Sequence, residues 1–133
     1  MPVLMALLAI AAASSAQPAS ESASIDGNWR NPGGSVVVTI APCGVAICGR
    51  VSWASDEASA DARRGGTDPL IGTLLMTGFK AAGPGKWRGR LFIPDINHRS
   101  KAELKMVGAD TLKVTGCAVA RMICKSQLWA RAD

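Results

Sequence analysis

The chain has 133 residues and a net charge of +5, with 48% hydrophobic and 19% charged residues. This apolar content is enough to build a packed core, which excludes a disordered chain, and the length fits a single domain. The moderate charge is a poor argument for nucleic-acid binding, and we expect no nucleic-acid partner.

The N-terminal segment 1–16 is typical of a secretory signal peptide. An unbroken apolar run from Val3 to Ala13 precedes Ser14-Ser15-Ala16, which has small residues at the positions a signal peptidase reads. The run has roughly half the length of a membrane-spanning helix, so we expect cleavage after Ala16 and no transmembrane anchor. Residues 17–24 would then be a linker, and residues 25–133 one domain, periplasmic or secreted.

Apolar and polar residues alternate through most of this domain, as they do in half-buried strands. In 35–41, Val36, Val38 and Ile40 share one face, and in 47–55 the inward face carries Val51 and Trp53. Further strands are expected in 70–79, 86–94, 101–106, 112–115 and 121–131, with a loop at 95–99. For 70–79 a short helix is the alternative. About eight short strands joined by Gly, Pro, Asn and Asp turns predict an all-β, antiparallel up-and-down barrel or a sandwich.

Residues 54–69 break the alternation, and we expect a long loop that is either functional or mobile. The segment carries four carboxylates, Asp56, Glu57, Asp61 and Asp68. Paired carboxylates can perform acid–base hydrolysis, which makes a hydrolytic enzyme the alternative function. An exposed loop with mixed charges is also simply well solvated.

The four cysteines all lie in the expected mature domain, where export favours disulfides. Their spacings lack the two-residue gap of common zinc sites, so we predict the bridges Cys43–Cys48 and Cys117–Cys124 and no metal. By alternation Cys117 lies on the outer face, whereas Cys124 shares its parity with the apolar Leu128. The second bridge therefore points to a bulge.

Two short motifs with a tryptophan stand at the two ends of the domain. Gly27-Asn28-Trp29 opens the first strand and Trp129-Ala130-Arg131 ends the last. A first-strand Trp with a last-strand Arg stacked on it resembles the device that closes lipocalin barrels, and the stacking contributes about 0.5–2 kcal/mol. We therefore expect Trp29 and Arg131 to close one end of a lipocalin-like barrel.

One ordered series of residues spans nearly the whole domain: Gly27, Trp29, Cys43, Cys48-Gly49-Arg50, Gly72, Gly78-Phe79, Trp87, Pro94, 112–117, Cys124 and Ser126-Gln127-Leu128-Trp129 with Arg131. This series resembles a family of small exported bacterial proteins catalogued as domain of unknown function 2147. The resemblance implies a signal peptide, an antiparallel barrel and no assigned activity. The chain departs from the family pattern at Phe92-Ile93-Pro94, where the family tends to have Tyr-x-Pro, and it contains no Tyr.

Few residues suggest catalysis. His98 is the chain's one histidine, and a Ser-His-Asp triad would need it beside Asp95 and a serine in a nucleophile elbow, which is missing. We therefore assign no catalytic residue, cofactor or metal ligand.

An eight-stranded barrel is either filled by side chains or holds one small ligand. Four Trp indicate a mostly filled interior, with room for a small apolar cleft at one mouth. We predict that Trp53, Met76, Phe79 and Trp87 line this cleft and that residues 54–69 form its lid. The expected function is a binding module for a small apolar or amphipathic ligand or for an anionic envelope component, which a charge of +5 would attract.

Overall fold

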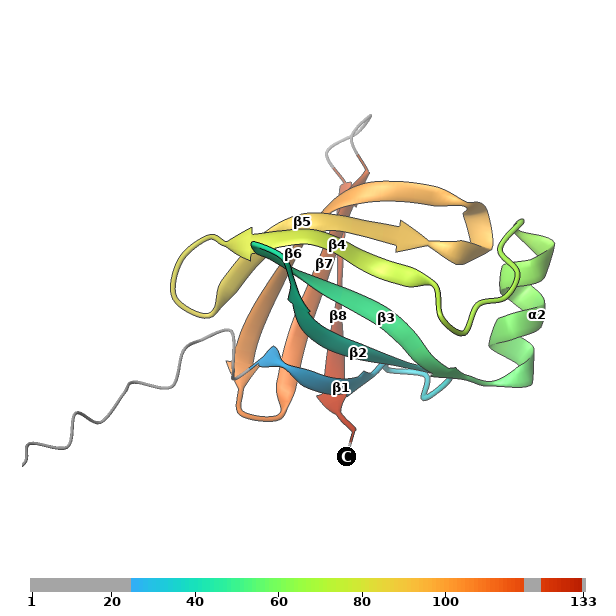
Figure 1. Cartoon of the computed structure of the whole chain (residues 1–133), viewed down its shortest axis with the longest axis horizontal. Coiled ribbons are helices and arrows are strands. Elements are labelled where there is room, and N and C mark those ends of the chain that lie inside the picture. The colour runs from blue at the N-terminus through green and yellow to red at the C-terminus, as the bar shows by residue number, and fades with distance from the viewer. Residues whose placement is uncertain (1–24, 119–122, 133) are drawn as a thin grey trace, which may run out of the picture.

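The computed structural model describes residues 25–118 and 123–132. In this part of the chain eight antiparallel strands form a closed barrel in sequence order (Figure 1). The strands are β1 (Gly27–Arg30), β2 (Val36–Cys43), β3 (Ala46–Ala54), β4 (Leu74–Ala81), β5 (Lys86–Ile93), β6 (His98–Gly108), β7 (Thr111–Ala118) and β8 (Ile123–Arg131). The predicted up-and-down barrel is confirmed, and the predicted signal peptide and linker lie outside the described residues.

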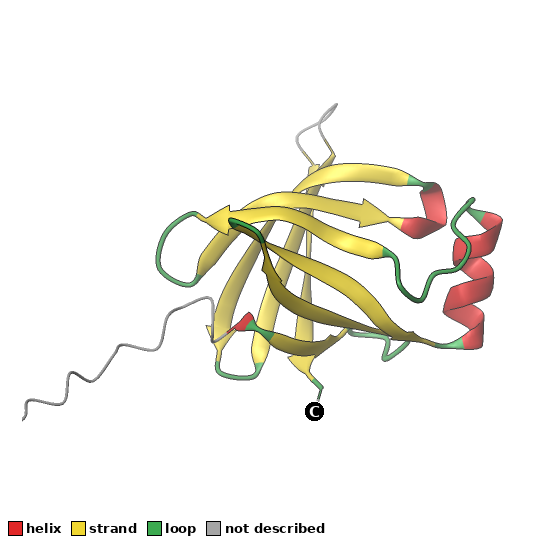
Figure 2. Ribbon diagram, in the orientation of Figure 1, coloured by secondary structure: helices red, strands yellow, loops and turns green. Residues whose placement is uncertain are grey.

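Two short helices lie together at one end of the barrel, α2 (Asp56–Arg64) and the 3-10 helix η1 (Pro94–Ile96) (Figure 2). Within the described residues, no helix is both long enough and apolar enough to cross a membrane.

The core fills the barrel with the inward residues of each strand. Trp29 and Phe79 are fully buried, and Val38, Val51 and Leu104 are at most 1% exposed. Their alternation with exposed neighbours is the two-residue period of a strand. The predicted inward face of β2 is therefore correct at Val38.

A bulge between β2 and β3 reverses the expected side of Trp53. The register runs from Val37 opposite Trp53 to Val38 opposite Val51, so β3 contributes one extra residue, Ser52. Val51 points inward as predicted, but Trp53 lies on the outer surface with 47% of its area exposed. The prediction that Trp53 shares the inward face of Val51 is wrong.

Both predicted disulfides are present. Cys43–Cys48 closes the β2–β3 hairpin with its Cα atoms 5.5 Å apart, and Cys117–Cys124 joins directly opposed residues of β7 and β8. The register between β7 and β8 is regular, so the expected bulge is absent from the described residues of this pair. Leu128 is exposed, which places Cys124 on the same outer face as Cys117.

The segment expected as a loop contains a helix, which corrects the prediction for 54–69. Ser55 caps α2 by accepting a hydrogen bond from the Ala58 N–H at 3.1 Å. Acidic residues occupy the first turn and basic residues the last, which suits the helix dipole. Ala62 is fully buried against the barrel, so the helix is part of the core. The chain becomes a strand at Leu74, four residues later than predicted.

The loop predicted at 95–99 is also partly regular. The 3-10 helix η1 includes the first two residues of this predicted loop, Asp95 and Ile96. Asn97 follows the helix, and its positive φ of 49° lets the chain turn. β6 then begins at His98, three residues earlier than predicted.

Candidate functional site

A cavity of about 660 Å³ lies at the barrel end beneath α2 and η1. Its volume falls within the range of small-molecule sites. Side chains of five strands give it apolar walls: Val36, Leu75, Leu91, Val114 and Trp129. Leu70, from the connection between α2 and β4, completes this lining.

One buried polar group faces this apolar space. Ser100 on β6 is 3% exposed, and its Oγ has no hydrogen-bond partner among the described residues. Gly116 lies beside it on β7, and a Cβ there would be 3.4 Å from that Oγ. A buried hydroxyl without a partner destabilises a fold by about 1–3 kcal/mol. The Ser100 Oγ is therefore a hydrogen-bonding group that the described part of the chain leaves without a partner.

The rim of the cavity is polar where β8 passes it. In the described residues, β1 pairs with β8 only at Ala130 and Arg131, so the preceding part of β8 has no partner strand on that side. Lys125 and Gln127 lie opposite Gly116 and Val114, line the cavity and stay exposed. An ammonium group and an amide thus stand at the entrance.

The opposite side of the rim is formed by α2. Glu57 and Asp61, four residues apart and therefore on one helix face, both line the cavity. Asp61 forms an ion pair with Arg64. The predicted carboxylates Asp56 and Asp68 do not line this cavity, and the described contacts place Asp68 3.9 Å from Arg63 instead.

Several contacts fasten α2 over the cavity. Gly65, which follows the helix, packs so closely on η1 that a Cβ would overlap the Asp95 carbonyl group. The Thr67 hydroxyl donates to the Pro94 carbonyl at 3.0 Å, and the Ser55 N–H donates to the Ser35 carbonyl at 2.8 Å. With both its ends tied, α2 is a fixed cap and not a loose loop.

His98 and Asp95 also line the cavity rim, where both are exposed. Ser100 lies two residues after His98 on the same face of β6. Because the Ser100 Oγ has no partner among the described residues, His98 does not hydrogen-bond to it. The nucleophile–base pair that acyl transfer requires is not formed here.

The residues predicted to bind ligand lie elsewhere. Met76, Phe79 and Trp87 are at most 2% exposed and belong to the filled core, and Trp53 is on the outer surface. None of the four lines the cavity. Leu91 and Val114 could be expected to face inward from alternation alone, and Ser100 continues the inward parity of Leu104.

Two glycines explain why the core is tightly packed where a cleft lined by Met76, Phe79 and Trp87 was predicted. A Cβ at Gly49 would lie 2.8 Å from the Met76 Sδ, and one at Gly89 would lie 2.7 Å from the Phe79 ring. Met76 and Phe79 therefore occupy the space that larger residues on β3 and β5 would take.

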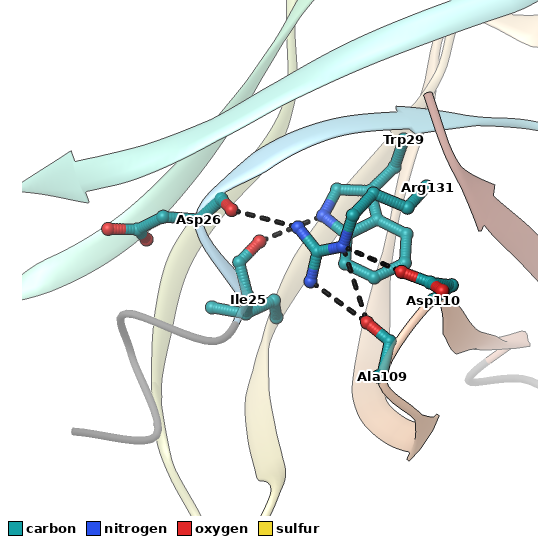
Figure 3. A network of polar contacts seen from close by, with 6 residues as sticks. All are labelled: Ile25, Asp26, Trp29, Ala109, Asp110 and Arg131. Atoms are coloured by element: carbon teal, nitrogen blue, oxygen red, sulfur yellow. Dashed lines mark hydrogen bonds and ion pairs between the residues drawn. The ribbon is translucent and has the colours of Figure 1, made fainter. Parts of the chain in front are cut away.

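The other end of the barrel is closed as predicted (Figure 3). The Arg131 guanidinium lies over the Trp29 ring, with its Cζ 4.3 Å from the ring centroid. Trp29 Nε1 donates to the Ile25 carbonyl at 2.8 Å. Arg131 donates twice to the Ala109 carbonyl, at 3.2 and 3.1 Å, and once to the Asp26 carbonyl at 3.1 Å. This end is sealed, which leaves the α2 end as the site.

Residues 27–131 match the family model described as "Uncharacterized protein conserved in bacteria (DUF2147)". A similar solved structure is titled "Protein HP1028 from the human pathogen Helicobacter pylori belongs to the lipocalin family", with a TM-score of 0.63 and 9% sequence identity. The alignment covers 81% of this chain and 82% of that one. At this identity the likeness establishes a lipocalin-like fold. A comparison with curated proteins finds no match.

Proposed function

The chain belongs to the DUF2147 family, and we propose that it is a non-enzymatic binding protein that holds a small amphipathic molecule in the cavity beneath α2. The observation that carries the proposal is the Ser100 hydroxyl, which lies inside an apolar cavity and has no hydrogen-bond partner among residues 25–118 and 123–132. A ligand atom that hydrogen-bonds to this hydroxyl would remove its desolvation penalty.

The lining defines the chemistry of the ligand. Leu91, Val114 and Trp129 offer apolar surface, so most of the molecule is hydrocarbon or aromatic. The Ser100 Oγ selects a hydroxyl, carbonyl or similar group at the buried end. Lys125 and Glu57 at the rim suit a second polar group that stays near water.

A binding role fits these residues better than hydrolysis. Two of the four carboxylates that hydrolysis would require form ion pairs with neighbouring arginines, Asp61 with Arg64 and Asp68 with Arg63. In the part of the chain that the structure describes, no base hydrogen-bonds to Ser100 to make it a nucleophile.

We also propose that the protein works outside the cytoplasm, in the periplasm or secreted. Two disulfides in a small domain are typical of an oxidising compartment. The expected signal peptide in residues 1–16 would deliver the chain there.

Native mass spectrometry of the protein purified from its own cells tests the proposed function. We expect an adduct of constant mass that solvent extraction releases. Ser100→Ala should retain less of it, because the hydrogen bond at the buried end is lost. Ser52→Ala, on the outer face of β3, is the matched control and should retain it fully. A bare wild-type chain that also fails to take up an apolar fluorescent probe would refute the proposal.

A further inference from the structure

One wall of the barrel gathers most of the chain's positive charge. The outer faces of β4 to β7 carry eight of the fifteen Lys and Arg residues and one of the ten acidic residues, Glu103. These cations, which we call the basic wall, are Lys80, Lys86, Arg88, Arg90, Arg99, Lys101, Lys105 and Lys113. With Glu103 the wall carries +7, so the rest of the chain sums to −2.

The register sets like charges directly opposite each other. Lys105 on β6 lies between Lys86 on β5 and Lys113 on β7, and Arg90 faces Lys101. Directly opposed like charges destabilise an antiparallel pair. Apart from the exposed Arg88–Glu103 ion pair, these opposed cations do not stabilise the fold, which is consistent with contact to a surface of opposite charge.

We propose that the basic wall binds the surface of a membrane through anionic phospholipid headgroups. The cations cover four strands and several rows along them, an area of roughly 15 by 20 Å on ordinary strand spacings. A two-dimensional array of this kind matches a planar surface with distributed phosphates. This inference does not depend on the cavity having a ligand.

Nucleic acid fits the wall less well. Single-stranded nucleic acid is bound by exposed aromatic rings on which bases stack, together with a cationic groove. Phe92 is the aromatic residue on this wall, and the Arg99 guanidinium covers its ring at 5.0 Å. Trp53, which is exposed, lies on β3 outside the wall.

Flotation with vesicles tests the proposal, using the full protein purified from its own cells. We expect binding to vesicles of equal parts phosphatidylglycerol and phosphatidylcholine, weak binding to pure phosphatidylcholine, and release by salt. Each cation near an anionic surface strengthens binding about fivefold. Lys105→Glu should therefore weaken binding at least about fivefold.

Arg30→Glu is the matched control, because it makes the same change in net charge on β1, which lies outside the wall and three strands from β6 around the closed barrel. It should weaken binding by no more than about twofold. All variants share the same N-terminal segment, so differences between them report on the wall.

Three results would overturn the proposal: equal binding to both kinds of vesicle, equal losses in Lys105→Glu and Arg30→Glu, or tighter binding to single-stranded DNA than to the anionic vesicles. Ser100→Ala should float with vesicles as the wild type does. Failure of the cavity proposal is thus distinguishable from failure of this one.

Discussion

Replacing Arg131 by Ala should destabilise the barrel by about 2–4 kcal/mol, more than stacking on Trp29 alone would predict. The cation–π contact contributes about 0.5–2 kcal/mol. The substitution also removes the donors to the Ala109 and Asp26 carbonyls, and hydrogen bonds from a charged group contribute about 1.5–3 kcal/mol where they are not screened. The side chain is 19% exposed, so screening reduces these contributions only in part. Arg131→Lys keeps the charge but loses the planar fork and should lie between wild type and Ala.

Urea unfolding measures this loss directly. With a slope of about 1–2 kcal/mol/M for a domain of this size, the midpoint of Arg131→Ala should fall by about 1–4 M. Arg63→Ala is the control, since its ion pair with Asp68 is exposed and should contribute less than about 1 kcal/mol. If Arg131→Ala unfolds within about 0.5 kcal/mol of the wild type, the guanidinium does not hold the two ends of the barrel together.

Three further changes have defined outcomes. Gly65→Ala should displace α2 from Asp95 and lower both the urea midpoint and probe uptake by the cavity, whereas Gly108→Ala, with open space around it, should change neither. Lys105→Glu should raise stability by about 0.5 kcal/mol in thermal unfolding at low salt, because two like-charge pairs become attractive; a loss would contradict the register. Burial raises the pKa of the Asp26 carboxyl above its ordinary 3.8, because it disfavours the ionised form in the folded state. The fold is therefore unaffected below pH 3.8, loses stability as the pH rises from there, and has lost the full amount above the raised pKa. Asp26→Asn should therefore raise the urea midpoint at pH 7 but not near pH 3; an equal gain at both would refute this origin.

The features that could be predicted from the sequence are those encoded locally. Alternation of apolar residues predicts strands, and the short spacing of Cys43 and Cys48 predicts a bridge across one hairpin. The pairing of Trp29 with Arg131 was predictable although 102 positions separate them, because an up-and-down barrel must bring its first and last strands together. The barrel and its closed end follow from these local patterns.

The errors arise where long-range packing overrides the local pattern. A bulge adds one residue to β3 and turns Trp53 outward, and no residue type marks its place. α2 has a capping Ser55 and suitably placed charges, but its buried residue is Ala62, too small to indicate a core helix. The position of the cavity depends also on Gly49 and Gly89. Because these residues have no side chains, Met76 and Phe79 fill the space beside them, and this part of the barrel holds no cavity.

The cavity and the basic wall share strands β4 to β7, and β5 and β6 show how the two are separated. On β5 Leu91 lines the cavity while its neighbour Arg90 points outward, and on β6 Ser100 lines the cavity while Lys101 points outward. Leu91 lies opposite Ser100, and Arg90 lies opposite Lys101. Because the side chains of a strand alternate between its faces, each of the two proposed functions can be tested without changing the residues of the other. Because the cavity residues and the cations lie on opposite faces of the same strands, only the thickness of the sheet separates the cavity from a surface that contacts the wall.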